Sequence, residues 1–302
     1  MIRCERASIE RGGQLVVETV SLAVRAGEAW AVIGTSGAGK STLLAAVATA
    51  VPLHGGEILV HGQSVRRAAE RVRRLVGYVP DSLPDWPGLR AAEFLELFAV
   101  AAGLVGDAMR QAVDKSLAMA GLAGSGRMEL QSLDAGHAKH LLIARSLLHD
   151  PEVLVMDDPF SGLDPLERPA IERLIGDAHL MGRTVLAAID DARVPSCFTH
   201  LAVLREGRLI AEGRNDPTAF AGGQRWRFGL RCPGRGTEVA RVVGPLGEDS
   251  RAVDDDTVTL RIDPAQYRPQ EIIAAVVRAG LPVEAAGYDP PWQAQLLEPQ
   301  PG

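Results

Sequence analysis

The sequence predicts an α/β protein with a largely parallel sheet, an inserted block of helices and a smaller α+β module after it. Short apolar stretches typical of buried strands, such as 29–34, 152–157 and 184–189, alternate with stretches of helical periodicity. From about residue 84 to 150 the pattern is mostly helical, which predicts an inserted helical subdomain. A polar, glycine-containing break at 215–224 separates this region from a second, smaller pattern of strands and helices.

The first predicted elements surround a glycine-rich turn. Residues 15–26 alternate between apolar and polar side chains, as in a half-buried strand. The apolar run 29–34 leads into the turn and then into a helix that begins at Lys40. Further strands are predicted at 56–62, between glycines, and at 74–80. A strand, a glycine-rich turn and a helix in this order are the context expected of a phosphate-binding loop.

Helices and then strands follow in the second half of this domain. Helical periodicity is clearest at 90–104, 107–122 and 137–150. The strands 152–157 and 184–189 are separated by a predicted helix at 165–182, and residues 200–213 form a hairpin that turns at Glu206–Gly207.

The C-terminal pattern predicts a separate module. Its elements follow the order β-α-β-β-α-β, with the two middle strands joined by a tight turn at residues 254–256. This order resembles a ferredoxin-like module. We therefore predict one domain over residues 1–220 and a second over 221–302.

Composition excludes several classes of protein. Hydrophobic residues make up 46% and charged residues 23% of the 302 residues, as in ordinary soluble proteins. The formal net charge of −6 argues against a nucleic-acid partner, which usually needs a basic surface. The three cysteines lie far apart in the sequence and lack metal-ligand spacing. Neither a signal-peptide core nor an apolar run of about 20 residues occurs, so we expect a cytosolic protein.

The stretch GTSGAGKST at 34–42 matches the phosphate-binding pattern G-x-x-x-x-G-K-S/T. Backbone N–H groups of such a loop surround phosphate oxygens, and the following helix adds its dipole. Lys40 is placed for the β- and γ-phosphates, Ser41 for Mg²⁺, and Asp157 for the same metal ion. The predicted ligands are ATP and Mg²⁺, and the nucleotide-binding residues of the loop are Gly34, Thr35, Ser36, Gly37, Ala38, Gly39, Lys40, Ser41 and Thr42.

Over roughly residues 1–215 the chain resembles the ATP-binding cassette of ABC transporters. GYVPD at 77–81 stands where that family has its Q-loop, and 132–159 resembles the family's signature, the helix after it and the Walker B strand. SGLD at 161–164 resembles the D-loop, and AIDDA at 188–192 covers the position of the switch histidine. The C-terminal module resembles the extension carried by ATPases of exporters for drugs, lipids or polysaccharides.

Five positions depart from the family pattern. Aspartates replace the Q-loop glutamine, the catalytic Walker B glutamate and the switch histidine, and a further aspartate replaces the signature serine. The residues concerned are Asp81, Asp158, Asp190, the signature run Asp134-Ala135-Gly136-His137, and Arg11, which stands where the family has an aromatic residue that stacks on adenine. An arginine plane also stacks on a base.

The resemblance implies ATP binding with weak hydrolysis. Asp158 would serve as the catalytic base, but its carboxylate should lie roughly 1 Å further back than a glutamate's, and misplacement on that scale costs about 10²-fold in rate. Asp190 in this chain's site, and Asp134 facing a partner's ATP, would place carboxylates near the γ-phosphate. Gly136 would contact the same partner nucleotide, whereas Asp81 is a suitable Mg²⁺ ligand. Each substitution alone is also compatible with variation within a working enzyme.

The leading functional hypothesis is an ATP-binding subunit of an exporter, peripheral on the cytoplasmic face of the membrane. Its expected partners are a membrane-spanning permease subunit and a second ATP-binding subunit, identical or different. Trp86 follows the Q-loop and is either an anchor for the permease or part of ordinary loop packing. The alternative is a non-hydrolysing nucleotide-binding regulatory module. A soluble ABC ATPase that acts on nucleic acid or ribosomes is disfavoured by the single cassette and the acidic balance.

Overall fold

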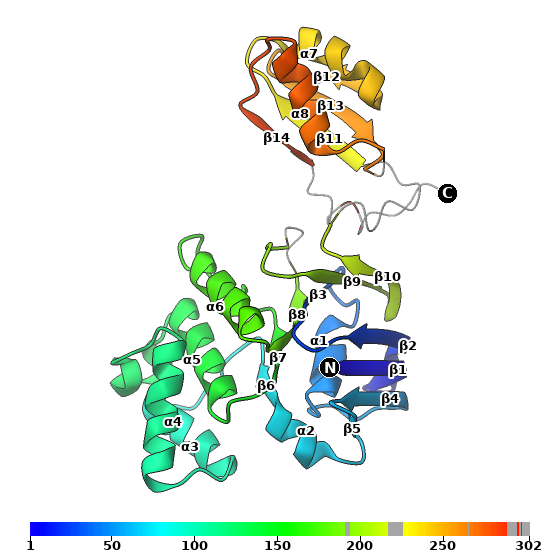
Figure 1. Cartoon of the computed structure of the whole chain (residues 1–302). Helices are drawn as coiled ribbons and strands as arrows, with labels where there is room; N and C mark the ends of the chain where they lie inside the picture. The colour runs from blue at the N-terminus through cyan, green and yellow to red at the C-terminus, as the bar shows by residue number, and fades with distance from the viewer. Residues whose placement is uncertain (191–193, 217–225, 265, 289–294, 296, 298–302) are drawn as a thin grey trace. The chain divides into compact units, whose positions relative to one another are not determined.

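The computed structural model describes residues 1–190, 194–216, 226–264, 266–288, 295 and 297. The chain divides into two compact units, Met1–Glu212 and Gly213–Gly302 (Figure 1). Part of the expected break, residues 217–224, lies outside the described residues.

A six-stranded sheet forms the centre of the first unit, in the order β10-β9-β3-β8-β7-β6. Each pairing of β3 with β8 and β9, and of β7 with β6 and β8, is parallel, so the predicted parallel sheet is confirmed. Every residue of β3, β7 and β8 is buried, because both faces of a parallel sheet are covered. The strands are β3 (Ala29–Ile33), β6 (Val76–Val79), β7 (Val153–Asp157), β8 (Thr184–Ile189), β9 (His200–Arg205) and β10 (Arg208–Arg214).

A second, antiparallel sheet has the order β2-β1-β4-β5. Its strands are β1 (Ile2–Arg11), β2 (Gln14–Val24), β4 (Gly55–Val60) and β5 (Gln63–Ser64). The sequence did not predict β1, because the strand has irregular register shifts at Cys4/Ala7 and Ala7/Ile9 that interrupt its period-two alternation.

Helix α1 (Lys40–Val47) lies between the two sheets. Every residue of α1 except Ser41 is buried. Its side chains join one hydrophobic core with residues of both sheets, including Ile9 and Val60 from the antiparallel sheet and Val155 from β7. This double burial holds the start of α1, and with it the phosphate loop, in a fixed position.

The predicted helical subdomain lies beside the β6–β7 edge of the parallel sheet, as Figure 1 shows. It consists of α3 (Ala91–Ala101), α4 (Gly106–Met119) and α5 (Ala135–Leu147), with short 3₁₀ turns at Ser125–Arg127 and Leu130–Ser132. Helix α2 (Ala69–Leu75) precedes β6, and α6 (Arg168–Leu180) connects β7 to β8. Over the described ranges, none of the helices combines the length and apolar character needed to cross a bilayer.

The second unit contains the predicted β-α-β-β-α-β order. Its sheet has the antiparallel order β12-β13-β11-β14, which is the ferredoxin-like arrangement. Helices α7 and α8 contribute Val239 and Ile272 to a core shared with Phe228 and Leu260 of the sheet. The elements are β11 (Trp226–Arg231), α7 (Gly236–Val243), a 3₁₀ turn (Gly244–Leu246), β12 (Glu248–Ala252), β13 (Thr257–Ile262), α8 (Pro269–Arg278) and β14 (Ala285–Tyr288).

Candidate functional site

The phosphate loop connects the end of β3 to the start of α1. Gly39, the last loop residue, has a φ angle of 98°. A β-carbon at Gly39 would lie 2.8 Å from the Val16 carbonyl oxygen, so both the conformation and the space require glycine. The Gly207 N–H donates to the Ala38 carbonyl at 3.1 Å, and the Glu18 N–H donates to the Gly207 carbonyl at 2.8 Å. The β9–β10 turn therefore braces the loop against β2, a support that the sequence did not predict.

Lys40 is buried at the first turn of α1, with 4% of its side chain exposed. Its ammonium group donates to the carbonyl oxygens of Gly34 at 2.8 Å and Thr35 at 2.9 Å. It also lies 2.8 Å from the carboxylate of Asp190, which is 58% exposed. All three N–H donors of Lys40 thus have a partner within the protein.

Asp157 ends β7 and is buried, with 8% of the residue exposed. Burial raises the pKa of Asp157, and a hydrogen bond from the Ser41 hydroxyl opposes that increase. Two predicted metal-binding residues, Ser41 and Asp157, therefore lie close together.

Asp158 follows directly and has a φ angle of 39°, in the left-handed region. Its N–H donates to the Ala188 carbonyl at 3.1 Å, so β8 holds its backbone. Burial, and next the negative charge of Asp190, raise the pKa of Asp158 to about 6. A carboxylate with this pKa is ionised at neutral pH and suited to accept a proton there.

Lys139 of α5 reaches the same site, although the sequence did not point to it. Its ammonium group donates to the carbonyl oxygens of Asp81 at 2.7 Å and Asp158 at 2.9 Å. It also lies 3.6 Å from the Asp81 carboxylate. A signal was present: the chain has only three lysines, and Lys139 is followed closely by the apolar run Leu141–Ala144.

Asp134, the residue at the signature serine position, is the N-cap of α5. Its carboxylate accepts a hydrogen bond from the His137 N–H at 2.8 Å and contacts the His137 ring at 2.7 Å. These contacts hold the pKa of Asp134 below its ordinary value. Aspartate and serine are comparably good N-caps, so the substitution retains the local helix geometry. The Glu167 carboxylate occupies the space that a β-carbon at Gly136 would need.

Arg11 lies at the exposed end of β1, next to the two-residue turn into β2.

Trp86 packs in an aromatic cluster: its ring centroid lies 5.8 Å from that of Phe94 and 6.3 Å from that of Phe98. The guanidinium of Arg145 lies 4.5 Å above the Phe98 ring. Trp86 nevertheless remains 40% exposed, so it both packs in its loop and presents a surface.

Comparisons with known proteins agree with this geometry. The family model described as ABC transporter matches residues 17–161. Nod factor export ATP-binding protein I of Cupriavidus metallidurans is 31% identical over 206 residues, covering 67% of this chain and 67% of that protein. The chain belongs to the ABC transporter family, as an ATP-binding subunit. The match spans about two thirds of the length of the curated relatives.

Other ABC proteins are similar to the chain at lower identity. Linearmycin resistance ATP-binding protein LnrL of Bacillus subtilis is 27% identical over 215 residues, covering 70% of this chain and 69% of LnrL. A solved ATP-binding subunit of an ABC transporter superposes with a TM-score of 0.65 at 26% identity, covering 74% of this chain and 93% of that one. The cassette fold and nucleotide binding are thus common to this chain and its relatives.

The ABC site offers oxygen ligands of the kind that Mg²⁺ prefers. Ser41 and Asp157 supply a hydroxyl and a carboxylate that lie close together. Within the described residues, no group of three or more His, Cys, Asp or Glu side chains is arranged to hold a metal ion. In nucleotide sites, Mg²⁺ takes one or two protein ligands and completes its shell with phosphate and water oxygens.

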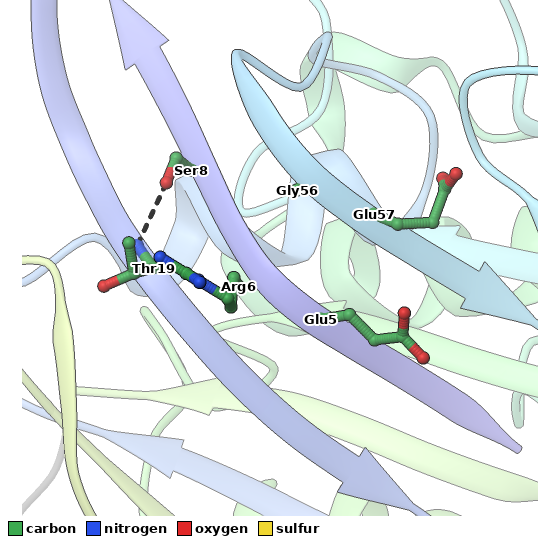
Figure 2. A pocket seen from close by; sticks show the side chains of 6 residues that line it. All are labelled: Glu5, Arg6, Ser8, Thr19, Gly56 and Glu57. Atoms are coloured by element: carbon green, nitrogen blue, oxygen red, sulfur yellow. Dashed lines mark hydrogen bonds between the residues drawn. The ribbon is translucent and has the colours of Figure 1, made fainter.

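A separate shallow concavity lies over β1, β2 and β4. Figure 2 shows its lining, including Arg6, Ser8, Thr19 and Gly56, with the Ser8 hydroxyl accepting the Thr19 N–H at 3.0 Å. Arg6 and Thr19 both have φ angles of 49°. The β1–β4 register shifts between Glu5 and Ser8. The concavity is therefore the surface of a β-bulge, and it contains none of the predicted site residues.

Proposed function

We propose that the chain is the ATP-binding subunit of an exporter and that it hydrolyses MgATP slowly. Export is supported by the relatives, one named for Nod factor export and another for linearmycin resistance. The ferredoxin-like C-terminal module, which resembles the extension of exporter ATPases, is consistent with this class.

The observation that carries an impaired nucleotide site is the Lys40–Asp190 ion pair, at 2.8 Å. Lys40 is the residue that should bind the β- and γ-phosphates. A phosphate that binds Lys40 must displace the Asp190 carboxylate or share the ammonium with it, and two like charges at such range repel each other. Part of the binding free energy is therefore used to separate an existing ion pair.

Asp158 is the proposed catalytic base. Its carboxylate is half-buried, and its pKa of about 6 leaves it ionised at neutral pH. Its short side chain positions the attacking water less well than a glutamate would. Ser41 and Asp157 would hold Mg²⁺, which would offset negative charge on the nucleotide. Asp81, whose carboxylate faces Lys139, is proposed as a more distant ligand of the same ion.

The base of the nucleotide is assigned to Arg11, whose guanidinium plane would stack on adenine. In a closed dimer, Asp134 and Gly136 would face the partner's nucleotide. The carboxylate of Asp134 caps α5. An ionised carboxylate only accepts hydrogen bonds, whereas a serine at this position would also donate one. Both sites of a homodimer would share these defects, which favours pairing with a second, more complete ATP-binding subunit.

A membrane-spanning permease is the proposed second partner, which would place the chain at the cytoplasmic face of the membrane. A groove of about 700 Å³ between the sheet and the helical subdomain offers a docking surface. Its lining combines Tyr78 and Phe98 with the positive side chains of Arg73, Arg74 and Arg145. Trp86 stacks on Phe98 beside this groove and would serve as an anchor.

To test the proposed slow hydrolysis, ATP binding and Mg-ATP hydrolysis are measured in one preparation of the purified chain, with Lys40→Ala as the control. We expect binding that is lost in Lys40→Ala and turnover below about 1 s⁻¹, the lower end of ordinary enzyme rates. Turnover at tens per second by the homodimer would contradict the assignment of impaired hydrolysis. Recovery of a membrane protein with the chain from solubilised membranes would support the transport role, and its absence would count against it.

A further inference from the structure

Lys139 is the buried cation that joins α5 to the nucleotide site. Only 3% of its side chain is exposed. Its ammonium group donates to two backbone carbonyls, those of Asp81 at 2.7 Å and Asp158 at 2.9 Å. Asp81 begins the loop after β6, whereas Asp158 follows β7. One side chain of the helical subdomain therefore connects two loops of the parallel sheet.

The buried charge of Lys139 is partly offset by nearby carboxylates. Burial of an unpaired ammonium would be strongly unfavourable. Burial lowers the pKa of Lys139, and the negative charges of Asp81, Asp158 and Asp157 oppose this effect. The carboxylate of Asp81 is the nearest of them, at 3.6 Å. The two carbonyl contacts, together with this carboxylate, locate the Lys139 ammonium group between the loops.

The contact with Asp158 supports an unfavourable backbone conformation. A non-glycine residue with φ of 39° carries a cost of about 1 kcal/mol or more and persists only when its surroundings hold it. Three hydrogen bonds do so. The Asp158 N–H donates to the Ala188 carbonyl, and the Asp158 carbonyl accepts from the Ser161 N–H at 3.2 Å as well as from Lys139. The direction of the Asp158 side chain depends on this conformation.

We propose that Lys139 is a positioning residue, which holds Asp158 in its left-handed conformation and fixes the loop that begins at Asp81 to α5. Movement of the helical subdomain would then shift the Asp158 backbone, and the carboxylate would move with it. The effect of this movement on turnover rests on the proposed hydrolysis, but the positioning itself does not.

The test compares Lys139→Met with Lys115→Met, a matched change at an exposed lysine of α4. Hydrogen exchange measured by mass spectrometry follows three segments of the full chain: 81–90, 157–162 and the phosphate loop 34–42. We expect Lys139→Met to accelerate exchange in the first two segments together by about tenfold, the equivalent of about 1.4 kcal/mol, with the phosphate loop unchanged. Lys115→Met should change none of them.

Lys139→Gln provides a second variant, because its amide keeps a hydrogen-bond donor but lacks the charge and the reach. It should give a smaller acceleration in the same two segments. If Lys139→Met does not fold, Lys139→Gln decides the result. Unchanged exchange in either segment of a folded variant would overturn the proposal, as would equal acceleration throughout the cassette.

Kinetics separate positioning from a general structural role. Lys139→Met should lower kcat about tenfold or more and leave KM for MgATP within about threefold, because Lys40 and the phosphate loop are intact. In an Asp158→Asn background the same change should lower kcat no further, since both act through one group. Additive losses would overturn the proposal. If the wild-type chain binds ATP without hydrolysing it, the proposed hydrolysis fails and hydrogen exchange alone decides the role of Lys139.

Discussion

The ammonium group of Lys40 and the carboxylate of Asp190 form an ion pair at 2.8 Å, inside the loop that binds phosphate. Asp190 stands at the end of β8, and Lys40 begins α1. The pair arises because β3 and β8 are adjacent parallel strands whose carboxyl ends lie at the same edge of the sheet. The chain therefore places a carboxylate of its own against the lysine.

Removing this anion should strengthen nucleotide binding. Asp190→Asn is expected to raise ATP affinity about fivefold, equivalent to about 1 kcal/mol, which is the size of a partly exposed ion pair. Titration with a fluorescent ATP analogue measures the change. Asp107→Asn, at a strongly exposed aspartate of α4, is the control and should leave the affinity unchanged. Weaker binding by Asp190→Asn would show that the carboxylate assists the nucleotide.

The raised pKa of Asp158 predicts a pH-dependent stability. Its folded-state pKa of about 6 exceeds the ordinary aspartate value of 3.8, so the folded state binds the proton more tightly than the unfolded state. This group therefore destabilises the fold above about pH 6, and that penalty falls as the pH decreases towards 4. Asp158→Asn should raise the free energy of unfolding at pH 7.5 by about 1 kcal/mol after allowance for solvent screening.

Thermal unfolding in the absence of nucleotide measures the predicted effect of Asp158 on stability. The Asp158→Asn variant should unfold about 2–4 °C higher at pH 7.5 and show a smaller difference from the wild type at pH 5. An equal shift at both pH values would rule out the charge of Asp158 as the cause. Hydrolysis by the wild type should decline as the pH falls through about 6, because a protonated Asp158 no longer accepts a proton.

The role of Asp134 as a helix cap predicts different effects of two substitutions. Asp134→Ala should lower the free energy of unfolding, since the His137 N–H loses its acceptor. Asp134→Ser should leave stability nearly unchanged, because serine caps equally well. Denaturant unfolding compares the two variants. Equal destabilisation by both would indicate that the contact with the His137 ring, rather than the cap, stabilises this end of α5.

Trp86 should contribute more to partner binding than to the fold. In Trp86→Ala, affinity for the permease subunit is expected to fall about tenfold or more, as at an aromatic anchor, while ATP affinity stays constant. Leu166→Ala, at a residue that is 88% exposed, is the control. The affinity of each variant for the solubilised membrane subunit, immobilised on a sensor surface, distinguishes the effect of Trp86→Ala from that of Leu166→Ala. Unchanged permease binding by Trp86→Ala would assign the residue to loop packing alone.

The cassette should fold without the second unit. A chain that ends at Glu212 retains the first compact unit, its hydrophobic core and all the nucleotide-site residues. We expect cooperative thermal unfolding and ATP affinity within about twofold of the full chain, which a truncated variant can verify directly. A loss of ATP binding in a folded truncated chain would show that residues after Glu212 contribute to the site.

The sequence by itself determined the local elements of the nucleotide site. The spacing of Gly34, Gly39, Lys40 and Ser41 is contained within one short stretch, so strand, loop and helix follow from local pattern. The apolar runs of the parallel strands were equally clear, because strands buried on both faces carry apolar side chains throughout. Strand β1 was missed because its register shifts break the alternation.

Only the tertiary structure decided how distant residues meet. Lys40 and Asp190 are 150 positions apart in sequence, and Lys139 reaches Asp81 across 58 positions. Neither contact has a sequence period or a fixed spacing, since both depend on which strands are neighbours and on where α5 packs. The same holds for Asp134: the sequence showed an aspartate in place of a serine, whereas its hydrogen bond to His137 showed that it caps a helix. Charges that are remote along the chain acquire their roles from three-dimensional proximity, because electrostatic interaction depends on distance in space.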